Sequence, residues 1–192
     1  MLSRIAESLF WIGRYLERAE DTARTLDVHL QLLIDDPSVD QEAAARALLR
    51  VMGAEDPNPG ANLESEVMRL LCYDDDSPSS MVSAIGGARE AARRARETVS
   101  TEMWEAINTT YNEVFSASFT AIRPTASLQL VRLRCVQIAG LASQTMVHDE
   151  AYHFFLLGQS LERVDMTSRL ISTVAVEGNT LVAWTRALRA VD

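Results

Sequence analysis

The chain contains no lysine, few glycines and prolines, and only two cysteines in 192 residues. The lack of lysine excludes a Schiff-base lysine and the lysine of a phosphate-binding P-loop. Eight glycines and five prolines leave few positions that would interrupt a helix. Cys72 and Cys135 lack the Cys-x-x-Cys spacing of zinc and redox motifs, so we expect two reduced, buried thiols.

Positive charge and long apolar runs are also scarce. Eighteen basic residues stand against 27 acidic ones, for a net charge of −9. A chain this acidic is a poor candidate for binding nucleic acid or an anionic membrane surface. No apolar run approaches the ~20 residues of a membrane-spanning helix, and the charged first turn does not resemble a signal peptide. These absences predict a cytoplasmic protein without nucleic-acid or membrane partners.

Apolar residues with helical spacing dominate what is present. Between Leu2 and Leu33 they alternate steps of three and four residues, the heptad pattern of a long packed helix. No segment alternates with the period of a strand. The sequence therefore predicts an all-α protein, a multi-helix bundle forming a single domain over residues 1–192. The most apolar helical segment, residues 125–147, is expected to be central. Further helical patterns cover residues 63–72, 81–99, 101–118 and 149–175.

Two pairs of residues are predicted to begin helices. Ser38 and Gln41 have the spacing of a capping box, for a helix that ends before Gly53. Ser77 and Pro78 have the order of an N-cap followed by a first helical residue. Whether the 81–99 helix continues into the 101–118 helix is open at this level.

Two segments of the chain repeat each other. Residues 16–24 read LERAEDTAR and residues 161–169 read LERVDMTSR, and the match reaches upstream to Gly13/Gly158 and Phe10/Phe155. Charged positions match as well as apolar ones, so a shared helical period does not explain the similarity. The sequence predicts two related Glu-Arg helices, an internal pseudo-repeat. Its charged members are Glu17, Arg18, Glu20, Arg24, Glu162, Arg163, Asp165 and Arg169.

The charged stripes have two interpretations. They are solvated helix faces with weak surface pairs, or the two helices face each other about a pseudo-twofold axis. In the second case a partly buried network of four charges would determine which helices pair, at little net gain in stability. The expected cross-pairs are Glu17 with Arg163 or Arg169 and Glu162 with Arg18 or Arg24.

The only cluster whose residues suggest a specific metal site is HDEAYH, residues 148–153. Glu150 and His153 have the Glu-x-x-His spacing of di-iron bundles, but such a site needs a second copy that the chain lacks. His153 is therefore interpreted as an interface or core histidine, and no metal or other cofactor is expected. No Gly-x-Ser-x-Gly nucleophile motif is present either.

Three stretches resemble the alpha-E family, bacterial helical domains named for a Glu-Arg motif. They are the opening MLSRIAESLFWIGRYLERAEDTARTLD, the middle AREAARRARETVSTEMWEAIN, and FFLLGQSLERVDMTSRLI, which resembles the second Glu-Arg segment. The resemblance covers residues 1–171. The middle-motif residues that match are Arg89, Glu90, Arg93, Glu102, Trp104 and Asn108.

This resemblance implies a genomic setting rather than a reaction. Alpha-E proteins are typically encoded beside, or fused to, an ATP-grasp amide ligase, often with a transglutaminase-like protein nearby. We therefore expect a non-catalytic accessory or scaffold subunit in making or modifying a peptide, with one of these neighbours or a second copy of the chain as partner.

Two alternatives belong to other classes of function. One is an enzyme that uses Glu17, Arg24, Glu162 and Arg169 for acid-base chemistry or anion binding. The other is a metal-binding bundle with carboxylate and histidine ligands. Burial separates the first alternative from the scaffold, because an enzyme needs its carboxylates in an open pocket with shifted pKa values.

Overall fold

The computed structural model describes residues 2–54, 60–176 and 181–191, with side chains for all of these except 173–176, 181–183, 186 and 191. Every regular element in these ranges is helical, and they contain no strand. The predicted all-α bundle is confirmed. No described helix is long and apolar enough to cross a membrane.

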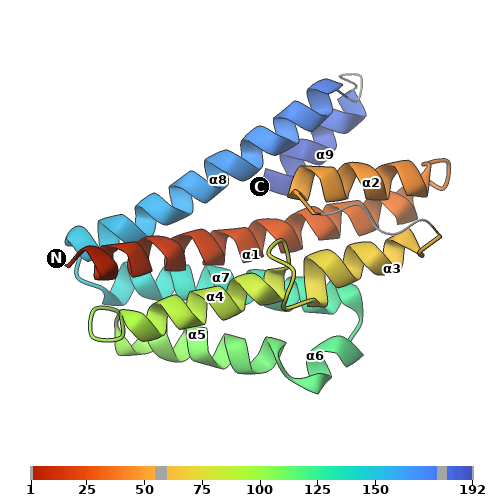
Figure 1. The fold of residues 1–192 in the computed structure, drawn as a ribbon. Helices are drawn as coiled ribbons and strands as arrows, with labels where there is room; N and C mark the ends of the chain where they lie inside the picture. Colours follow the sequence, from red (N-terminus) through yellow and green to blue (C-terminus); the bar gives the residue numbers. More distant parts are fainter. Residues whose placement is uncertain (1, 55–59, 177–180, 192) are drawn as a thin grey trace.

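The long helix α1 (Ser3–Asp35) runs through the middle of the molecule. Figure 1 shows α8 (Glu150–Val176) along one side of it, and α4 (Met81–Arg94) and α7 (Pro124–Thr145) along the other. α1 contacts all three of these helices. The part of its apolar seam between Leu9 and Leu26 is almost fully buried, because it meets neighbours on several sides. The buried seam residues are Leu9, Ile12, Leu16, Ala19, Ala23 and Leu26.

The shorter helices complete the bundle around this centre. The helix α5 packs on α4 and α7, and α9 lies against α1 and α8. The helix α3 continues directly into a turn of π-helix, η1, which also touches α1. The bounds are α2 (Gln41–Met52), α3 (Leu63–Met68), η1 (Arg69–Tyr73), α5 (Thr101–Val114), α6 (Ala117–Ala121) and α9 (Leu181–Val191).

Both predicted helix starts are wrong by a few residues. Asp40, not Ser38, caps α2 and accepts a hydrogen bond from the Ala43 N–H, while the Ser38 hydroxyl bonds to the Asp36 side chain. Ser80 caps α4 in place of Ser77. In each case several Asp and Ser residues precede the helix, and the pattern alone does not say which oxygen reaches the free N–H groups.

The 81–99 and 101–118 patterns belong to separate helices. α4 ends at Arg94, and Ser100 caps α5 by accepting from the Met103 N–H. α5 ends at Val114, before α6. Ala95 and Val99 stay buried in the turn between α4 and α5, so their apolar spacing reflects burial rather than a continuous helix.

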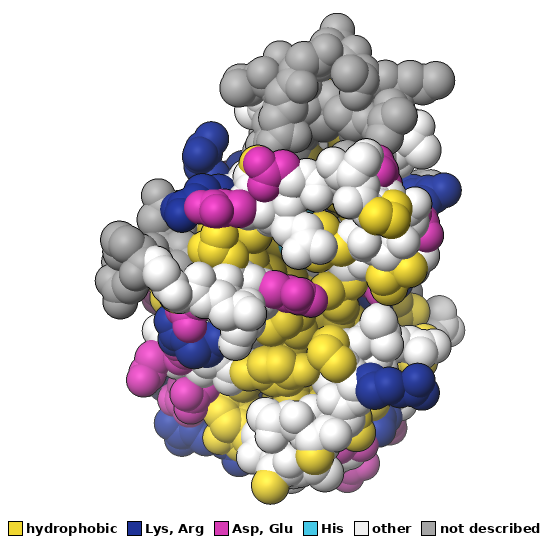
Figure 2. Space-filling view, turned by 90° about the vertical axis from the view of Figure 1, so that its right-hand side faces the viewer, with side chains coloured by type: hydrophobic (Ala, Val, Ile, Leu, Met, Phe, Trp, Pro, Cys, Tyr) yellow, Lys and Arg dark blue, Asp and Glu magenta, His cyan; other side chains and the backbone are white. Residues whose placement is uncertain are grey.

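The expectation that the apolar segment 125–147 is central is wrong. One face of α7 packs on α1 and α5, but Leu133 and Val136 on its outer face are 61% and 57% exposed. Figure 2 shows another exposed apolar area, over the end of the molecule where α1 ends and α6 lies. Ile34 in α1 and Ile122 after α6 are exposed apolar residues of these segments.

The two cysteines are free and buried, as expected. Burial raises the pKa of Cys72 to about 12. Burial also raises the pKa of Cys135, and the carboxylates of Glu20, Glu17 and Asp21 add to that effect. Neither thiol is therefore a thiolate near neutral pH.

Candidate functional site at the contact of α1 and α8

The backbones of α1 and α8 touch at two glycines. A Cβ on Gly13 would lie 2.1 Å from the carbonyl oxygen of Phe155, and a Cβ on Gly158 would lie 2.0 Å from that of Phe10. No side chain fits in either gap, because such distances are far below contact separation. The contact is reciprocal, since each glycine meets the carbonyl of the phenylalanine that precedes the other glycine by three residues. Small residues allow two helices to approach this closely.

Near this contact, the two Glu-Arg pairs cross from helix to helix. The Nε–H of Arg163 donates to Glu17 at 2.5 Å. Arg18 donates to Glu162 through Nε at 2.7 Å and through Nη2 at 3.1 Å. Glu17 is only 2% exposed and Glu162 only 1%. The predicted cross-pairs of Glu17 with Arg163 and of Glu162 with Arg18 are confirmed, and the solvated-face interpretation is wrong for these two carboxylates.

The two carboxylates differ in what surrounds them. Arg14 also donates to Glu162, so this carboxylate binds two guanidinium groups. The residue of α8 that matches Arg14 in the repeat is Gln159, and its amide reaches Glu17 at 3.5 Å. Glu17 therefore has one cationic partner, and the Arg163 side chain is 65% exposed. Burial raises the pKa of Glu17, while its bond to Arg163 opposes the shift.

The outer members of the motif pair within their own helices. Arg24 bonds to Glu20 in α1, and Arg169 bonds to Asp165 in α8 at 3.0 Å. Arg169 also donates to the backbone carbonyl of Val51 at the end of α2. Both outer arginines thus have a carboxylate partner four residues away on their own helix.

Sequence reasoning missed a run of buried polar groups on α1. Asp21, Thr22, Thr25 and His29 are all buried, and each has a side-chain oxygen or nitrogen without a hydrogen-bond partner in the described part of the chain. Burial, and next the nearby Glu17, raises the pKa of Asp21 to about 7. Burial lowers the pKa of His29. The only signal in the sequence was the four-residue spacing of Asp21, Thr25 and His29, which places them on one helix face.

One half of the Glu-Arg network opens onto a cavity of about 250 Å³. Glu162 and its partners Arg14 and Arg18 line it, together with Asp165 and Arg169. The end of α2 and the segment before α4 also line it, through Met52, Gly53, Pro78 and Ser79. Glu17 and Arg163 do not line this cavity. The enzyme alternative grouped Glu17, Arg24, Glu162 and Arg169, of which the cavity contains only Glu162 and Arg169.

Some residues of the middle motif connect α4 to α5, and others lie exposed on the surface of these helices. Arg89 donates to Asn108 at 2.9 Å and its guanidinium lies 4.4 Å from the centre of the Tyr111 ring. Trp104 is a partly buried ring against which Arg96 packs at 5.5 Å. Glu102 is exposed on the first turn of α5.

Two further residues of this motif form a surface ion pair. Arg93 bonds to Glu90 through two nitrogen atoms, at 2.9 and 2.8 Å. These bonds lower the pKa of Glu90 to about 2. The pair lies on the outside of α4, because both side chains are more than 40% exposed.

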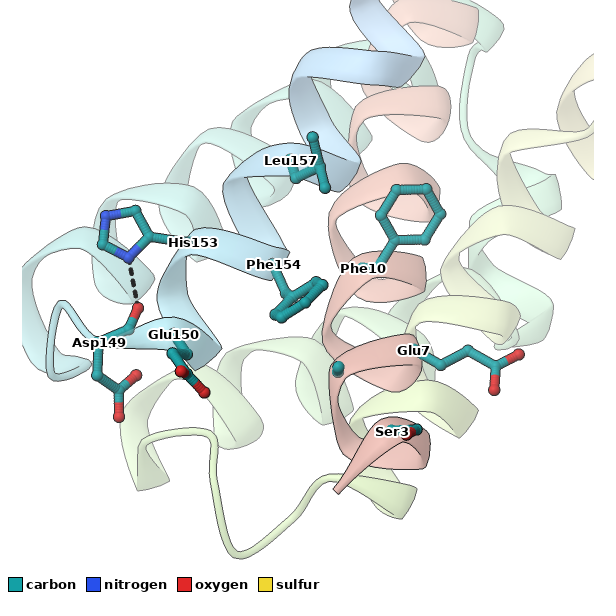
Figure 3. A pocket seen from close by; sticks show the side chains of 9 residues that line it. Ser3, Glu7, Phe10, Asp149, Glu150, His153, Phe154 and Leu157 are labelled. Carbon is teal, nitrogen blue, oxygen red and sulfur yellow. Dashed lines mark hydrogen bonds between the residues drawn. The ribbon is translucent and has the colours of Figure 1, made fainter. Parts of the chain in front are cut away.

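The possible metal ligands lie beside a larger groove of about 1110 Å³ between the first turns of α1 and α8 (Figure 3). His153 Nδ1 lies 2.5 Å from the backbone carbonyl of Asp149, one helical turn before it. Phe10, Phe154 and Leu157 give the groove its apolar wall. Among the described residues the only three candidate ligands close enough to share an ion are Asp74, Asp75 and Asp76, so Glu150 and His153 are not part of such a group.

Apolar residues continue from this groove along the outer face of α8. They recur at steps of three, four, three and seven residues, which places them on one side of the helix. Each is between 38% and 61% exposed. We call these residues the α8 stripe: Phe154, Leu157, Leu161, Val164 and Ile171.

Comparisons with known proteins identify the family of this chain. The family model Alpha-E, described as a predicted alpha-helical domain with a conserved ER motif, matches residues 1–192. The chain is 27% identical over 183 residues to the uncharacterized proteins Mb2597 of Mycobacterium bovis and Rv2567 of Mycobacterium tuberculosis. These alignments cover 83% of this chain but 21% of each relative, so the chain spans about a fifth of their length. No solved structure matches. The chain belongs to the Alpha-E family.

Proposed function

We propose that this chain is a non-catalytic binding domain that docks a helix of an ATP-grasp-type amide ligase along α8. In this role it is an accessory or scaffold subunit for making or modifying a peptide. The observation that carries the proposal is the α8 stripe, an exposed apolar helix face beside a preformed groove.

The stripe has the form of a helix-binding surface. The opposite face of α8 carries the buried residues Phe155, Glu162 and Met166 and packs on α1. A helix with apolar residues on two sides buries the second side against another element. Anchors at steps of three and four residues are the pattern with which one amphipathic helix receives another.

The groove at the start of the stripe indicates the charge of the partner. Phe154 and Leu157 belong to both the stripe and the groove. Glu7, Asp149 and Glu150 line the same groove, so its lining combines acidic groups with the apolar wall. A partner helix with apolar anchors and flanking Lys or Arg residues complements this surface, and such complementarity increases specificity and association rate.

The pairing of the Glu-Arg motif supports a structural rather than catalytic role for most of its charges. Glu17 is buried and bound by Arg163, away from the cavity. Such a pair is used to select which helices meet, while its net stabilisation is small.

The test is co-expression of this chain with an ATP-grasp-type amide ligase from the same organism, followed by size-exclusion chromatography with light scattering. The expected result is a complex with the summed mass of the two proteins. A variant with Leu157→Gln and Leu161→Gln should elute separately from the ligase.

The matched control is Leu133→Gln with Val136→Gln, which removes two equally exposed apolar residues from α7. It should leave the complex intact. Loss of the complex in both variants, or no complex with the unaltered chain, would contradict docking along α8. A doubled mass without the ligase would instead show that the stripe joins two copies of this chain.

A further inference from the structure

The cavity beside Glu162 shares no residue with the α8 stripe and concerns a ligand of another kind. We infer that it is a binding site for a small oxyanion, either a carboxylate or a phosphate group. The inference does not depend on docking of the ligase.

The first argument is local charge. Three arginines and two carboxylates line the cavity: Arg14, Arg18, Arg169, Glu162 and Asp165. Arg14 and Arg18 share the single carboxylate of Glu162. The lining therefore carries one positive charge in excess, within a chain whose net charge is −9. An anion in the cavity would balance that excess.

The second argument is that the arginines are already held in place. The Arg14 guanidinium lies 5.9 Å from the ring centre of Phe10 and 5.6 Å from that of Trp11. The Arg18 guanidinium lies 5.9 Å from the ring centre of Tyr15. Both side chains are largely buried, at 18% and 24% exposure. Because their positions are set before a ligand arrives, binding costs little side-chain entropy.

The third argument is the supply of donors. Glu162 takes the Nε–H of Arg14 and the Nε–H and one Nη2–H of Arg18. Each guanidinium has five N–H donors, so both retain donors beyond this carboxylate. Planar guanidinium groups bind carboxylate and phosphate oxygens through paired hydrogen bonds. The donor set therefore matches an oxyanion rather than a metal ion or an apolar ligand.

Cavity size limits the ligand. A volume of about 250 Å³ lies below the ~300–1,000 Å³ of pockets that hold drug-sized molecules. It suits free phosphate or the terminal carboxylate of a larger molecule. Arg169 stands in the wall, where it bonds to Asp165 at 3.0 Å and to the Val51 carbonyl at 3.4 Å. Asp165 thus competes with a bound anion for Arg169.

The test is isothermal titration calorimetry of the full chain with sodium phosphate and, separately, sodium acetate, at constant ionic strength balanced with chloride. Saturable binding of at least one probe is expected. Binding of phosphate alone assigns the site to a phosphate group, whereas binding of acetate assigns it to a carboxylate. Heats that match the chloride blank for both probes would overturn the inference.

Two variants must act in opposite directions. Arg169→Gln removes a cation and should weaken binding about tenfold, the loss expected for one charge-assisted contact. Asp165→Asn removes the competing carboxylate and should tighten binding about threefold. Arg93→Gln, on the exposed surface of α4, should change nothing.

A purely structural role for Arg169 predicts that both α8 variants weaken binding or have no effect, and either result would overturn the site. Arg169 and Asp165 are both about two-fifths exposed, so neither substitution leaves a fully buried charge unpaired. Thermal unfolding of each variant checks that the fold persists.

Discussion

Glu17 of α1 and Glu162 of α8 hold matched positions in the repeat and are both nearly fully buried, yet they have different partners. One mostly exposed arginine, Arg163, binds Glu17. Two largely buried arginines, Arg14 and Arg18, bind Glu162. The second arginine at Glu162 comes from one pair of matched positions, where α1 has Arg14 and α8 has Gln159. Two similar helices can thus form a reciprocal contact while only one side of it gains excess charge and a cavity.

The largest difference between the two sides should appear when each carboxylate is truncated. Glu162→Ala leaves Arg14 and Arg18 without their counter-ion in a largely buried position, and should cost about 3–5 kcal/mol of unfolding free energy. Glu17→Ala leaves only Arg163, which already reaches water, and should cost about 1–2 kcal/mol. Chemical denaturation at pH 7 measures both. Equal losses would contradict the asymmetry.

The close approach of the backbones should be equally sensitive on both sides. Gly13→Ala and Gly158→Ala each place a methyl group within about 2.1 Å of a carbonyl oxygen, so the helices must separate. Each should cost about 3 kcal/mol, as in overpacked cores. Gly140→Ala in α7 meets nothing within 4 Å and should instead stabilise the helix by about 0.5–1 kcal/mol. Thermal unfolding compares the three variants.

Asp21 and its match in α8, Met166, are both buried and should differ in their response to pH. The pKa of Asp21 is raised from 3.8 to about 7, so between these values the native state holds a proton that the unfolded state has lost. This stabilisation is complete below about pH 4 and disappears as the pH rises to 7. The raised pKa of Glu17 acts in the same direction, whereas the lowered pKa of His29 acts in the opposite one.

Asp21→Met copies the α8 residue into α1 and removes the pH-dependent contribution of Asp21 to the free energy of unfolding. At pH 8 the variant should be more stable than the unaltered chain, on the order of 2 kcal/mol, with little gain at pH 4. Denaturation curves across this range measure the difference. Asp27→Asn, at a partly exposed position of the same helix, is the control and should leave the change of unfolding free energy with pH as it is in the unaltered chain. A gain that is the same at pH 4 and pH 8 would contradict the proton-linked explanation.

The smallest effect is expected where an ion pair of similar geometry lies on the surface. Glu90 and Arg93 form a bidentate pair that lowers the pKa of Glu90 to about 2. Because both groups are solvated, Arg93→Gln should leave the melting temperature unchanged within error. A loss of stability comparable to that of Glu17→Ala would show that burial does not explain why the buried ion pairs contribute more than this surface pair.

Parts of the site could be predicted because they depend on local order along a helix. The matched charges at 17–18 and 162–163 limited each glutamate to two candidate partners, and the arginine directly after the matched glutamate is the one that pairs. Arg14 lies only three residues before Glu17 in α1, yet it bonds to Glu162 on the other helix. The spacing of residues within one helix does not determine which way a long side chain turns.

The sequence by itself determined the all-helical class and limited each buried carboxylate to two candidate arginines, because both follow from the helical period and the order of charges along the chain. Only the tertiary structure decided that α1 rather than α7 is central, that Asp21 is buried, and that α2 and the segment before α4 enclose the charges around Glu162. These outcomes depend on which faces other elements cover, and burial is a property of the assembled chain rather than of any one segment.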